Sequence, residues 1–361
     1  MAHALALGRR GLGRVWPNPA VGCVIVRQGR VVGRGRTADG GRPHAETEAL
    51  AMAGPAAAGA TAYVSLEPCA HHGQTPPCAE ALIAARVARV VVATGDPDAK
   101  VNGQGIAMLR GAGIEVSTGV LDAEARALNA GFLSRVTRGR PHLTLKLALS
   151  LDGRIATASG ESRWITGPDA RRHVHALRAR HDAVLVGGGT ARADDPTLTI
   201  RDLGADRQPV RIVASRALNL PWPNRLAETI DDAPVWIAHG DTQGDTDEAL
   251  RWQGAGAKLI PVAVHGGHLD PHKLLQSLGD HGLTRVFCEG GGTLAASFLA
   301  AGLVDELIIF SAGLAIGAEG QPGVGAMGLS ALSGAERFNL TETRRIGPDV
   351  LSRWQKPVSL A

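Results

Sequence analysis

Two short segments of the chain hold residue types that can bind a metal ion. The first reads Pro43-His44-Ala45-Glu46, and the second carries Cys69 and Cys78 at the ends of Cys69-Ala70-His71-His72-Gly73-Gln74-Thr75-Pro76-Pro77-Cys78. One imidazole and two thiolates make three ligands for Zn²⁺ and leave the fourth tetrahedral position to water, as a catalytic zinc site requires. Glu46 follows the histidine by two residues, which places it to carry protons rather than to bind the metal.

This pattern predicts a hydrolytic deaminase. Zinc deaminases combine His-x-Glu with a later Pro-Cys segment, and they use the glutamate as a general acid and base while ammonia leaves a ring carbon. A closed structural zinc site is the alternative, because His71 and His72 could also serve as ligands. We favour catalysis, because a structural zinc site would give Glu46 no task.

The length and composition are those of two ordinary globular domains. The chain has 361 residues, of which 44% are hydrophobic and 20% are charged, enough apolar material for two cores. The stretch Thr137-Arg138-Gly139-Arg140-Pro141-His142 is polar and interrupted by glycine and proline. We therefore expect one domain at 1–138 and a second at 143–361.

Charge and cysteine usage narrow the function class. Residues 1–138 carry 15 Lys+Arg against 10 Asp+Glu, and residues 143–361 carry 22 against 24. The mildly basic first half suits an anionic small molecule and lacks the concentrated basic stripe of nucleic-acid binding. Two of the four cysteines belong to the metal pattern, and no apolar run reaches the ~20 residues of a membrane span. We expect a cytoplasmic protein in a reducing compartment, without a signal peptide, that binds no nucleic acid and no membrane.

Apolar periodicity predicts alternating strands and helices in both halves. The first half is expected to be a layered α/β sandwich around one sheet, with the metal ligands at two helix starts, and the second half an α/β domain with a mostly parallel sheet. The expected helices of the first half are 45–53, 79–86, 105–111 and 122–135, and those of the second are 168–180, 271–280 and 293–301.

Two glycine runs in the second half each follow a predicted strand. They read Gly187-Gly188-Gly189-Thr190 and Glu289-Gly290-Gly291-Gly292-Thr293. Backbone N–H groups at such a turn can receive a pyrophosphate, above all where a helix begins. Neither run is the Gly-x-Gly-x-x-Gly fingerprint, and glycine-rich turns are routine in α/β folds. The runs alone leave cofactor binding and an ordinary turn open.

The spacing of the cysteines points to a particular family. Eight residues separate Cys69 from Cys78, whereas nucleic-acid and free-nucleoside deaminases typically show Cys-x-x-Cys. This loop and the opening Pro17-Asn18-Pro19-Ala20-Val21-Gly22-Cys23-Val24 resemble the deaminase half of the bifunctional riboflavin-biosynthesis deaminase/reductase family. The segments Lys146–Arg154, Ser162–Gly167 and Leu303–Leu307, together with both glycine runs, resemble its reductase half.

The resemblance implies a cytidine-deaminase-like α/β/α sandwich followed by a dihydrofolate-reductase-like α/β domain. It implies Zn²⁺ on His44, Cys69 and Cys78, with Glu46 as the catalytic proton carrier, and NADPH as the second cofactor. For the pyrimidine of the deaminase site it implies contacts from Asn18 and His71. For NADPH it implies Ala148, Trp164, Thr190, Asp194, Ser215, Gly291, Gly292 and Thr293, and for the reductase substrate Ser162, Arg178, Leu198, Arg201 and Glu289.

Several positions depart from the family pattern. Thr37 stands where the family usually has histidine, Glu48 replaces a second histidine, and Gln74 occupies a position usually held by lysine or arginine. We expect Arg36 or Arg42 to supply the missing positive charge for the substrate phosphate. Lys146 is a candidate for polarising the sugar carbonyl. Asp98-Ala99 and Ala312-Gly313 are further departures from the family pattern, and Cys23 is expected in the core.

The implied activity has two steps on one phosphorylated pyrimidine. The first is deamination of 2,5-diamino-6-ribosylamino-4(3H)-pyrimidinone 5′-phosphate. The second is NADPH-dependent reduction of the ribosyl group of 5-amino-6-(5-phosphoribosylamino)uracil to the ribitylamino product. Family analogy also implies a homodimer or homotetramer. Two rival hypotheses are a nucleic-acid base deaminase and a non-catalytic binding module with structural zinc.

Overall fold

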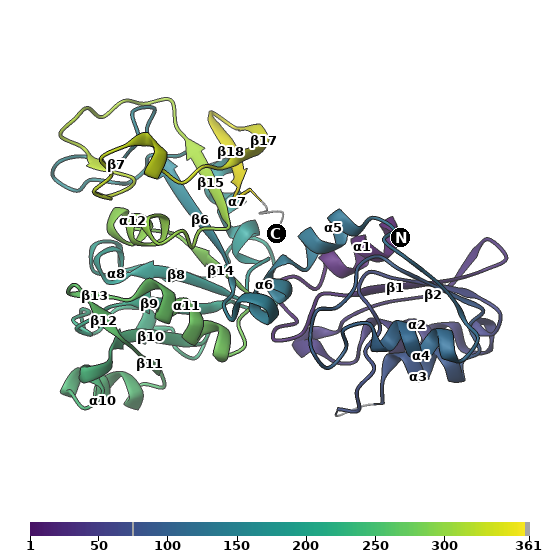
Figure 1. Cartoon of the computed structure of the whole chain (residues 1–361). Coiled ribbons are helices and arrows are strands. Elements are labelled where there is room, and N and C mark those ends of the chain that lie inside the picture. Colours follow the sequence, from purple (N-terminus) through teal and green to yellow (C-terminus); the bar gives the residue numbers. More distant parts are fainter. Residues whose placement is uncertain (74–75, 358–361) are drawn as a thin grey trace. The chain divides into compact units, whose positions relative to one another are not determined.

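The computed structural model describes residues 1–73 and 76–357. The chain folds into two compact units. We call them the N-terminal unit, which comprises Met1–Arg140 with Gly282–Thr284, and the C-terminal unit, which comprises the remainder. Each is described separately below (Figure 1).

The N-terminal unit is built on one mixed sheet. Within the described residues this sheet has five strands in the order β2-β1-β3-β4-β5. The first three neighbours pair antiparallel, whereas β3, β4 and β5 run parallel. A tight turn at Gln28-Gly29 joins the first two strands, with both residues at positive φ. The strand bounds are Gly22–Arg27 (β1), Arg30–Arg36 (β2), Thr61–Val64 (β3), Arg89–Val92 (β4) and Glu115–Thr118 (β5).

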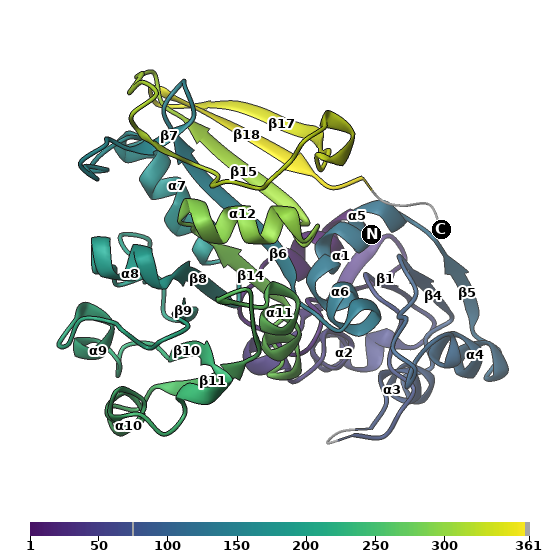
Figure 2. The same ribbon diagram turned by 60° about the vertical axis from the view of Figure 1, so that its left-hand side comes forward.

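Helices cover both faces of this sheet, with α2, α3 and α4 on one side and α1 and α5 on the other (Figures 1 and 2). The main core joins alanines of α2 to strand residues such as Ile25 and Val64. A β-carbon on Gly35 would lie 2.4 Å from the Ala45 carbonyl oxygen, so glycine lets the start of α2 approach β2 closely. The helix bounds are Ala2–Arg9 (α1), Ala45–Ala53 (α2), Cys78–Ala84 (α3), Gln104–Gly111 (α4), Asp122–Leu128 (α5) and Ala130–Arg138 (α6).

The C-terminal unit contains a larger sheet. In the part of the chain that the structure describes, it has nine strands in the order β11-β10-β9-β8-β14-β6-β15-β18-β17. The pairings from β11 to β15 are parallel, and the C-terminal hairpin β17–β18 adds antiparallel to β15. The bounds are His142–Leu149 (β6), Ala183–Gly187 (β8), Val210–Ala214 (β9), Val235–Gly240 (β10), Lys258–Val262 (β11), Arg285–Cys288 (β14), Glu306–Ser311 (β15), Asn339–Ile346 (β17) and Asp349–Gln355 (β18).

Two apolar clusters stabilise this unit. One packs Trp252 of α10 and Ala191 of α8 against the strands from β8 to β10. The other packs α7 through Val174 and Leu177 against Phe287, Phe310 and strand β18. The helix bounds are Pro168–Arg178 (α7), Gly188–Asp194 (α8), Arg225–Glu228 (α9), Asp247–Gly254 (α10), Pro271–Asp280 (α11) and Gly292–Ala300 (α12), and the short strands are Arg154–Ala156 (β7), Val264–His265 (β12), His268–Leu269 (β13) and Gln321–Pro322 (β16).

The fold class predicted from the sequence is confirmed, with local differences. The helix expected over 122–135 is two helices, because the backbone leaves helical geometry at Asn129 (φ −97°, ψ 15°). The antiparallel hairpin β17–β18 was not anticipated, because β17 is almost wholly exposed and shows no apolar alternation. No helix among the described residues combines the length and apolarity needed to cross a bilayer.

Candidate functional site

The predicted metal ligands meet in the N-terminal unit. His44 is the N-cap residue of α2, Cys78 is the first residue of α3, and Cys69 lies in the loop after β3. The His44 Nδ1 atom lies 3.6 Å from Cys69 Sγ and 3.4 Å from Cys78 Sγ, and the three ligand atoms all lie within 4.8 Å of one another. Two of the three ligands lie at helix starts, as the sequence predicted, whereas Cys69 lies in a loop, and the fold brings all three together.

The cluster fits zinc in both spacing and chemistry. With the usual zinc–nitrogen and zinc–sulfur bond lengths, the N···S edge of a tetrahedron is about 3.6 Å, which both observed distances match. A nitrogen and two sulfurs are also the borderline-soft ligands that zinc selects. The hydrogen bond from Cys78 and the contact with His44 outweigh burial and lower the pKa of Cys69 to about 4, which favours a thiolate.

Glu46 lies beside the three ligands on α2. Its side chain is 3% exposed. Burial, followed by the charge of Cys69, raises the pKa of Glu46 to about 7. A carboxyl group with this pKa exchanges protons readily at neutral pH, which is the requirement for a general acid and base. Cys23, which is also close enough to be affected by the charge of Glu46, is fully buried, and burial and that charge raise the pKa of its thiol.

The turn that carries Cys69 is fixed by contacts with residues 96–106, which lead into α4 and form its first turn. The buried Glu67 carboxylate accepts the backbone N–H groups of Asp96, Gly103 and Ile106 at 3.1–3.3 Å. A β-carbon on Gly105 would lie 1.9 Å from the Pro68 carbonyl oxygen. Sequence reasoning missed these supports, since a single glutamate or glycine carries no pattern that reports long-range contacts.

The predicted pyrimidine contacts lie in two loops of the N-terminal unit. Asn18 is half-buried and its amide donates to the Gly41 carbonyl oxygen at 3.2 Å, which ties it to the segment preceding His44. His71 is exposed in the loop between the two cysteines. The neighbouring His72 lies apart from the ligand cluster, with its Nε2 atom 3.4 Å from the Glu80 carboxylate.

The residues at the positions that depart from the family pattern, and the arginines near them, differ in their polar contacts. Thr37 is 2% exposed, and its hydroxyl donates to the Pro19 carbonyl and accepts the Val21 N–H, which fixes the start of β1. Arg36 pairs with Asp39 at 3.0 Å. The Arg42 guanidinium instead reaches the loop after His71, since a β-carbon on Gly73 would lie 3.5 Å from Arg42 Nη2. Gln74 lies outside the described residues.

In the C-terminal unit, the predicted cofactor contacts gather around the starts of α8 and α12. Gly291 and Thr190 touch, because a β-carbon on Gly291 would lie 2.8 Å from the Thr190 Oγ1 atom. Ser215 follows β9 and lies against Gly188, the first residue of α8. Gly292 and Thr293 begin α12, and Asp194 ends α8.

The loop before α7 carries two further predicted contacts. The Trp164 ring is 65% exposed and lies 4.4 Å from the Arg171 guanidinium carbon. Arg163 donates to the Asp194 carbonyl oxygen at 2.8 Å, which links this loop to the end of α8. Ser162 is half-buried in the same loop, and Ala148 is half-buried near the end of β6.

The predicted substrate contacts surround a buried ion pair. Arg178 at the end of α7 donates from Nε and Nη2 to the two oxygens of Glu289 at 2.5 and 3.0 Å, and both side chains are 11% exposed. Its Nη1 donates to the Thr199 carbonyl oxygen at 2.6 Å, beside Leu198 and Arg201. Leu198 is buried and Arg201 is exposed.

Lys146 on β6 faces the same ion pair. Burial lowers the pKa of Lys146, while the charges of Glu289 and Asp194 oppose this effect and that of Arg178 adds to it. The charge of Lys146 therefore interacts with that of Glu289, a predicted substrate contact, and with that of Asp194, a predicted cofactor contact.

Comparison with known proteins agrees with both halves of this description. Residues 1–94 match the family model "Cytidine and deoxycytidylate deaminase zinc-binding region", and residues 141–352 match "RibD C-terminal domain". The chain is 46% identical to the riboflavin biosynthesis protein RibD of Escherichia coli (strain K12), over 97% of this chain and 96% of the relative. It is 40% identical to RibD of Bacillus amyloliquefaciens, over 97% and 94%.

Solved structures are similar over nearly the whole chain. Acinetobacter baumannii RibD (form 1) has a TM-score of 0.89 and 38% identity, and the match covers 99% of this chain and 98% of that one. A Thermotoga maritima protein described as diaminohydroxyphosphoribosylaminopyrimidine deaminase/5-amino-6-(5-phosphoribosylamino)uracil reductase has a TM-score of 0.86 and 34% identity, with 99% and 97% covered.

Proposed function

The chain belongs to the RibD family of riboflavin-biosynthesis proteins, and from this premise we propose how its two units perform the deaminase and reductase steps. Residues 1–138 form the deaminase domain and residues 143–361 the reductase domain. The deaminase acts on 2,5-diamino-6-ribosylamino-4(3H)-pyrimidinone 5′-phosphate, and the reductase acts on 5-amino-6-(5-phosphoribosylamino)uracil. The enzyme is cytoplasmic and works as a homodimer or homotetramer. The observation that carries the proposal is the convergence of His44, Cys69 and Cys78 beside the buried Glu46.

The deaminase residues divide the work between holding the metal and moving protons. His44, Cys69 and Cys78 would hold zinc, which when bound would supply a water activated at neutral pH. Glu46, buried beside the three ligands, takes a proton from water and returns it to the departing amine. Asn18 and His71 orient the pyrimidine.

Arg42 supplies the positive charge for the substrate phosphate in this site. A β-carbon on Gly73 would lie 3.5 Å from the Arg42 Nη2 atom and 4.0 Å from the Cδ2 atom of the predicted pyrimidine contact His71, which places the Arg42 guanidinium near that contact. Guanidinium groups bind phosphate through two parallel hydrogen bonds. Arg42→Gln should therefore raise the deaminase KM with little change in kcat, and an unchanged KM would reject this role.

The reductase residues bind and orient, while the cofactor carries the chemistry. NADPH, when bound, supplies the hydride. Ala148, Trp164 and Ser215 would hold it together with Thr190 in the first turn of α8, Asp194 at the end of α8, and Gly291, Gly292 and Thr293 at the start of α12. Ser162, Arg178, Leu198, Arg201 and Glu289 contact the substrate, and Lys146 donates a hydrogen bond to the sugar carbonyl as it is reduced.

One assay tests both steps. Purified protein is incubated with the diaminopyrimidine phosphate, with and without NADPH, while ammonia and nicotinamide absorbance are followed. Ammonia should appear without NADPH, and NADPH should be consumed only after ammonia has been released. NADH in place of NADPH tests the cofactor, and RNA in place of the nucleotide tests the rival deaminase hypothesis. Failure to release ammonia from the pyrimidine would refute the proposal.

A further inference from the structure

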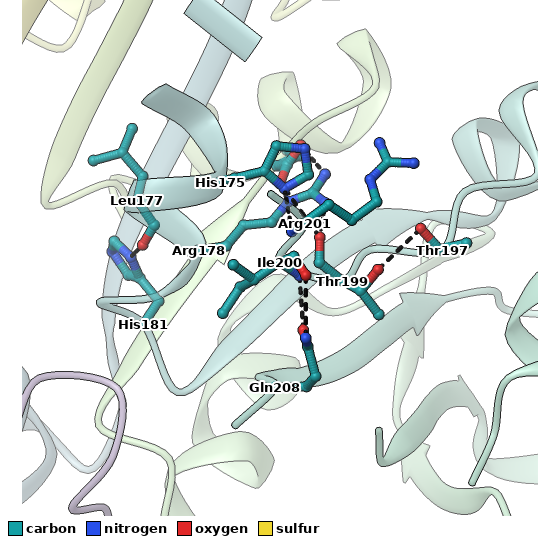
Figure 3. A network of polar contacts seen from close by, with 10 residues as sticks. His175, Leu177, Arg178, His181, Thr197, Thr199, Ile200, Arg201 and Gln208 are labelled. Atoms are coloured by element: carbon teal, nitrogen blue, oxygen red, sulfur yellow. Dashed lines mark hydrogen bonds and ion pairs between the residues drawn. The ribbon is translucent and has the colours of Figure 1, made fainter. Parts of the chain in front are cut away.

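The segment that carries two predicted substrate contacts, Leu198 and Arg201, is held by side chains from outside it. We call residues 197–201 the clamp segment. Gln208 accepts the Ile200 N–H at 2.7 Å and donates to the Ile200 carbonyl at 3.1 Å. Arg178 holds the Thr199 carbonyl from the other side. Figure 3 shows the clamp segment between Gln208 on one side and the side chains of α7 on the other.

His175, one turn before Arg178 on α7, makes the last of these contacts. Its Nδ1 atom lies 3.1 Å from the Thr199 carbonyl oxygen and 3.2 Å from the Arg201 backbone nitrogen, whose N–H points at it (Figure 3). A ring nitrogen either donates or accepts a hydrogen bond. Only one of the two contacts is therefore a hydrogen bond in a given protonation state.

The hydrogen bonds available to the Thr199 carbonyl and the Arg201 N–H decide between the neutral and the charged form of His175. Thr199 already accepts the charged donor Arg178 at 2.6 Å, so it is satisfied without His175. The Arg201 N–H has His175 as its acceptor. A neutral imidazole with its proton on Nε2 satisfies both backbone groups at once. An imidazolium would turn Nδ1 into a donor, and the Arg201 N–H would then face a second N–H.

The charges around the ring favour the neutral form. His175 is half-buried, and the groups facing it are Arg178 on its own helix, Arg201 on the clamp segment and Glu289 after β14. Burial, followed by the charges of Arg178 and Arg201, lowers the pKa of His175 below its usual value against the opposing effect of Glu289. The ring is thus neutral at physiological pH and becomes charged on acidification.

We propose that His175 is a positioning residue of the reductase, which orients the Arg201 side chain toward the substrate by accepting the Arg201 N–H. The inference rests on the proposed reductase function and assigns His175 no contact with the substrate. Protonation of the ring breaks this hydrogen bond and releases the backbone at Arg201. Substrate binding therefore weakens as His175 becomes charged, while the rate at saturation stays unchanged.

The test compares the pH dependence of the reductase KM in three proteins, with NADPH saturating. The Oδ1 atom of asparagine takes the place of Nδ1 and accepts the Arg201 N–H without titrating, so H175N isolates the protonation. H175A removes the acceptor at every pH. The substrate phosphate itself titrates near pH 6, and this contribution is common to all three proteins. Deaminase activity of the same samples is the internal control.

The wild-type KM should rise on acidification by about fivefold more than that of H175N, the worth of one hydrogen bond. H175A should show the raised KM throughout, with kcat preserved in all three proteins. Q208L, which loosens the clamp segment without touching a titrating group, should raise KM and keep the wild-type pH dependence. Parallel KM profiles for wild type and H175N would overturn the inference while leaving the reductase assignment intact. Absence of reductase activity in the wild type would instead refute the proposed function.

Discussion

At the deaminase site the functional side chains converge on a point, whereas at the reductase site they are distributed around a surface. Three ligand atoms lie within 4.8 Å in the N-terminal unit. In the C-terminal unit the predicted contacts come from β6, the loop before α7, the two glycine-rich helix starts, the clamp segment and the Arg178–Glu289 ion pair. The deaminase site therefore depends on the chemical identity of a few ligand atoms, whereas the reductase site depends on the relative positions of many residues. Four substitutions test this difference.

Loss of a metal ligand should have the largest effect. Cys69→Ala removes one of three protein ligands, so zinc content and deamination should both fall to background while reductase activity on the deaminated substrate is retained. Cys23→Ala is the matched control, because Cys23 is a buried thiol beside Glu46 that lies outside the ligand set. Metal analysis with the ammonia assay measures both. Full zinc occupancy in Cys69→Ala would contradict the assignment.

Loss of the proton carrier should come next and should separate chemistry from metal binding. Glu46→Gln keeps the shape of the side chain but removes the acid–base function, so deamination should fall by roughly 10²–10⁴-fold with zinc retained. Glu48→Gln on the exposed side of the same helix should behave as wild type. A Glu46→Gln protein that deaminates normally would favour the structural-zinc hypothesis.

At the reductase site, breaking the buried ion pair should act through stability as well as binding. Glu289→Gln leaves the Arg178 guanidinium buried and unpaired, which should cost about 3 kcal/mol in the free energy of unfolding of this unit. Glu342→Gln, in a more exposed pair with Arg353, should cost less than about 1 kcal/mol. Denaturant unfolding of the C-terminal unit measures both changes in the free energy of unfolding. Equal losses in the two variants would contradict the claim that burial makes the Arg178–Glu289 pair more important for stability than the exposed pair.

The Arg178–Glu289 ion pair should also make the free energy of unfolding depend on pH. Burial raises the pKa of Glu289, but the charge and hydrogen bonds of Arg178 outweigh it and leave the pKa lowered. A carboxylate with a lowered folded-state pKa stabilises the fold above its unfolded pKa, and this stability is lost as pH falls through the folded-state value. The acid sensitivity of unfolding should therefore be smaller in Glu289→Gln than in the wild type.

The smallest effect should come from Gly105, which contacts the turn that carries the zinc ligand Cys69. Gly105→Ala places a methyl group against the Pro68 carbonyl, which should shift Cys69, cost about 1–3 kcal/mol in unfolding free energy and weaken zinc binding. Gly111→Ala at the end of the same helix meets no atom within 4 Å and should leave both properties unchanged. Zinc titration of the metal-free proteins makes the comparison, and identical affinities would show that the ligand turn tolerates displacement.

The sequence predicted these two regions unequally, for a physical reason. His44, Glu46, Cys69 and Cys78 could be found because few residue types bind zinc and their spacing is local. The α/β alternation was equally accessible, because strands and helices here follow their apolar periodicity. The supports were not accessible, since Glu67, His175 and Gln208 act through hydrogen bonds to backbone groups, and isolated residues of these types form no recognisable sequence pattern.

The order of strands in the larger sheet has a consequence for how the chain matures during translation. Strand β6 is made first but lies between β14 and β15, and Thr144 of β6 pairs with Phe287 and Glu306. All strands of the smaller sheet lie within Gly22–Thr118. That sheet can assemble while the ribosome is still adding residues, whereas β6 waits for about 140 more, roughly 7–30 s at ordinary elongation rates. Both edges of β6 remain unpaired until β14 and β15 are made. The nascent chain most needs chaperone protection during this interval.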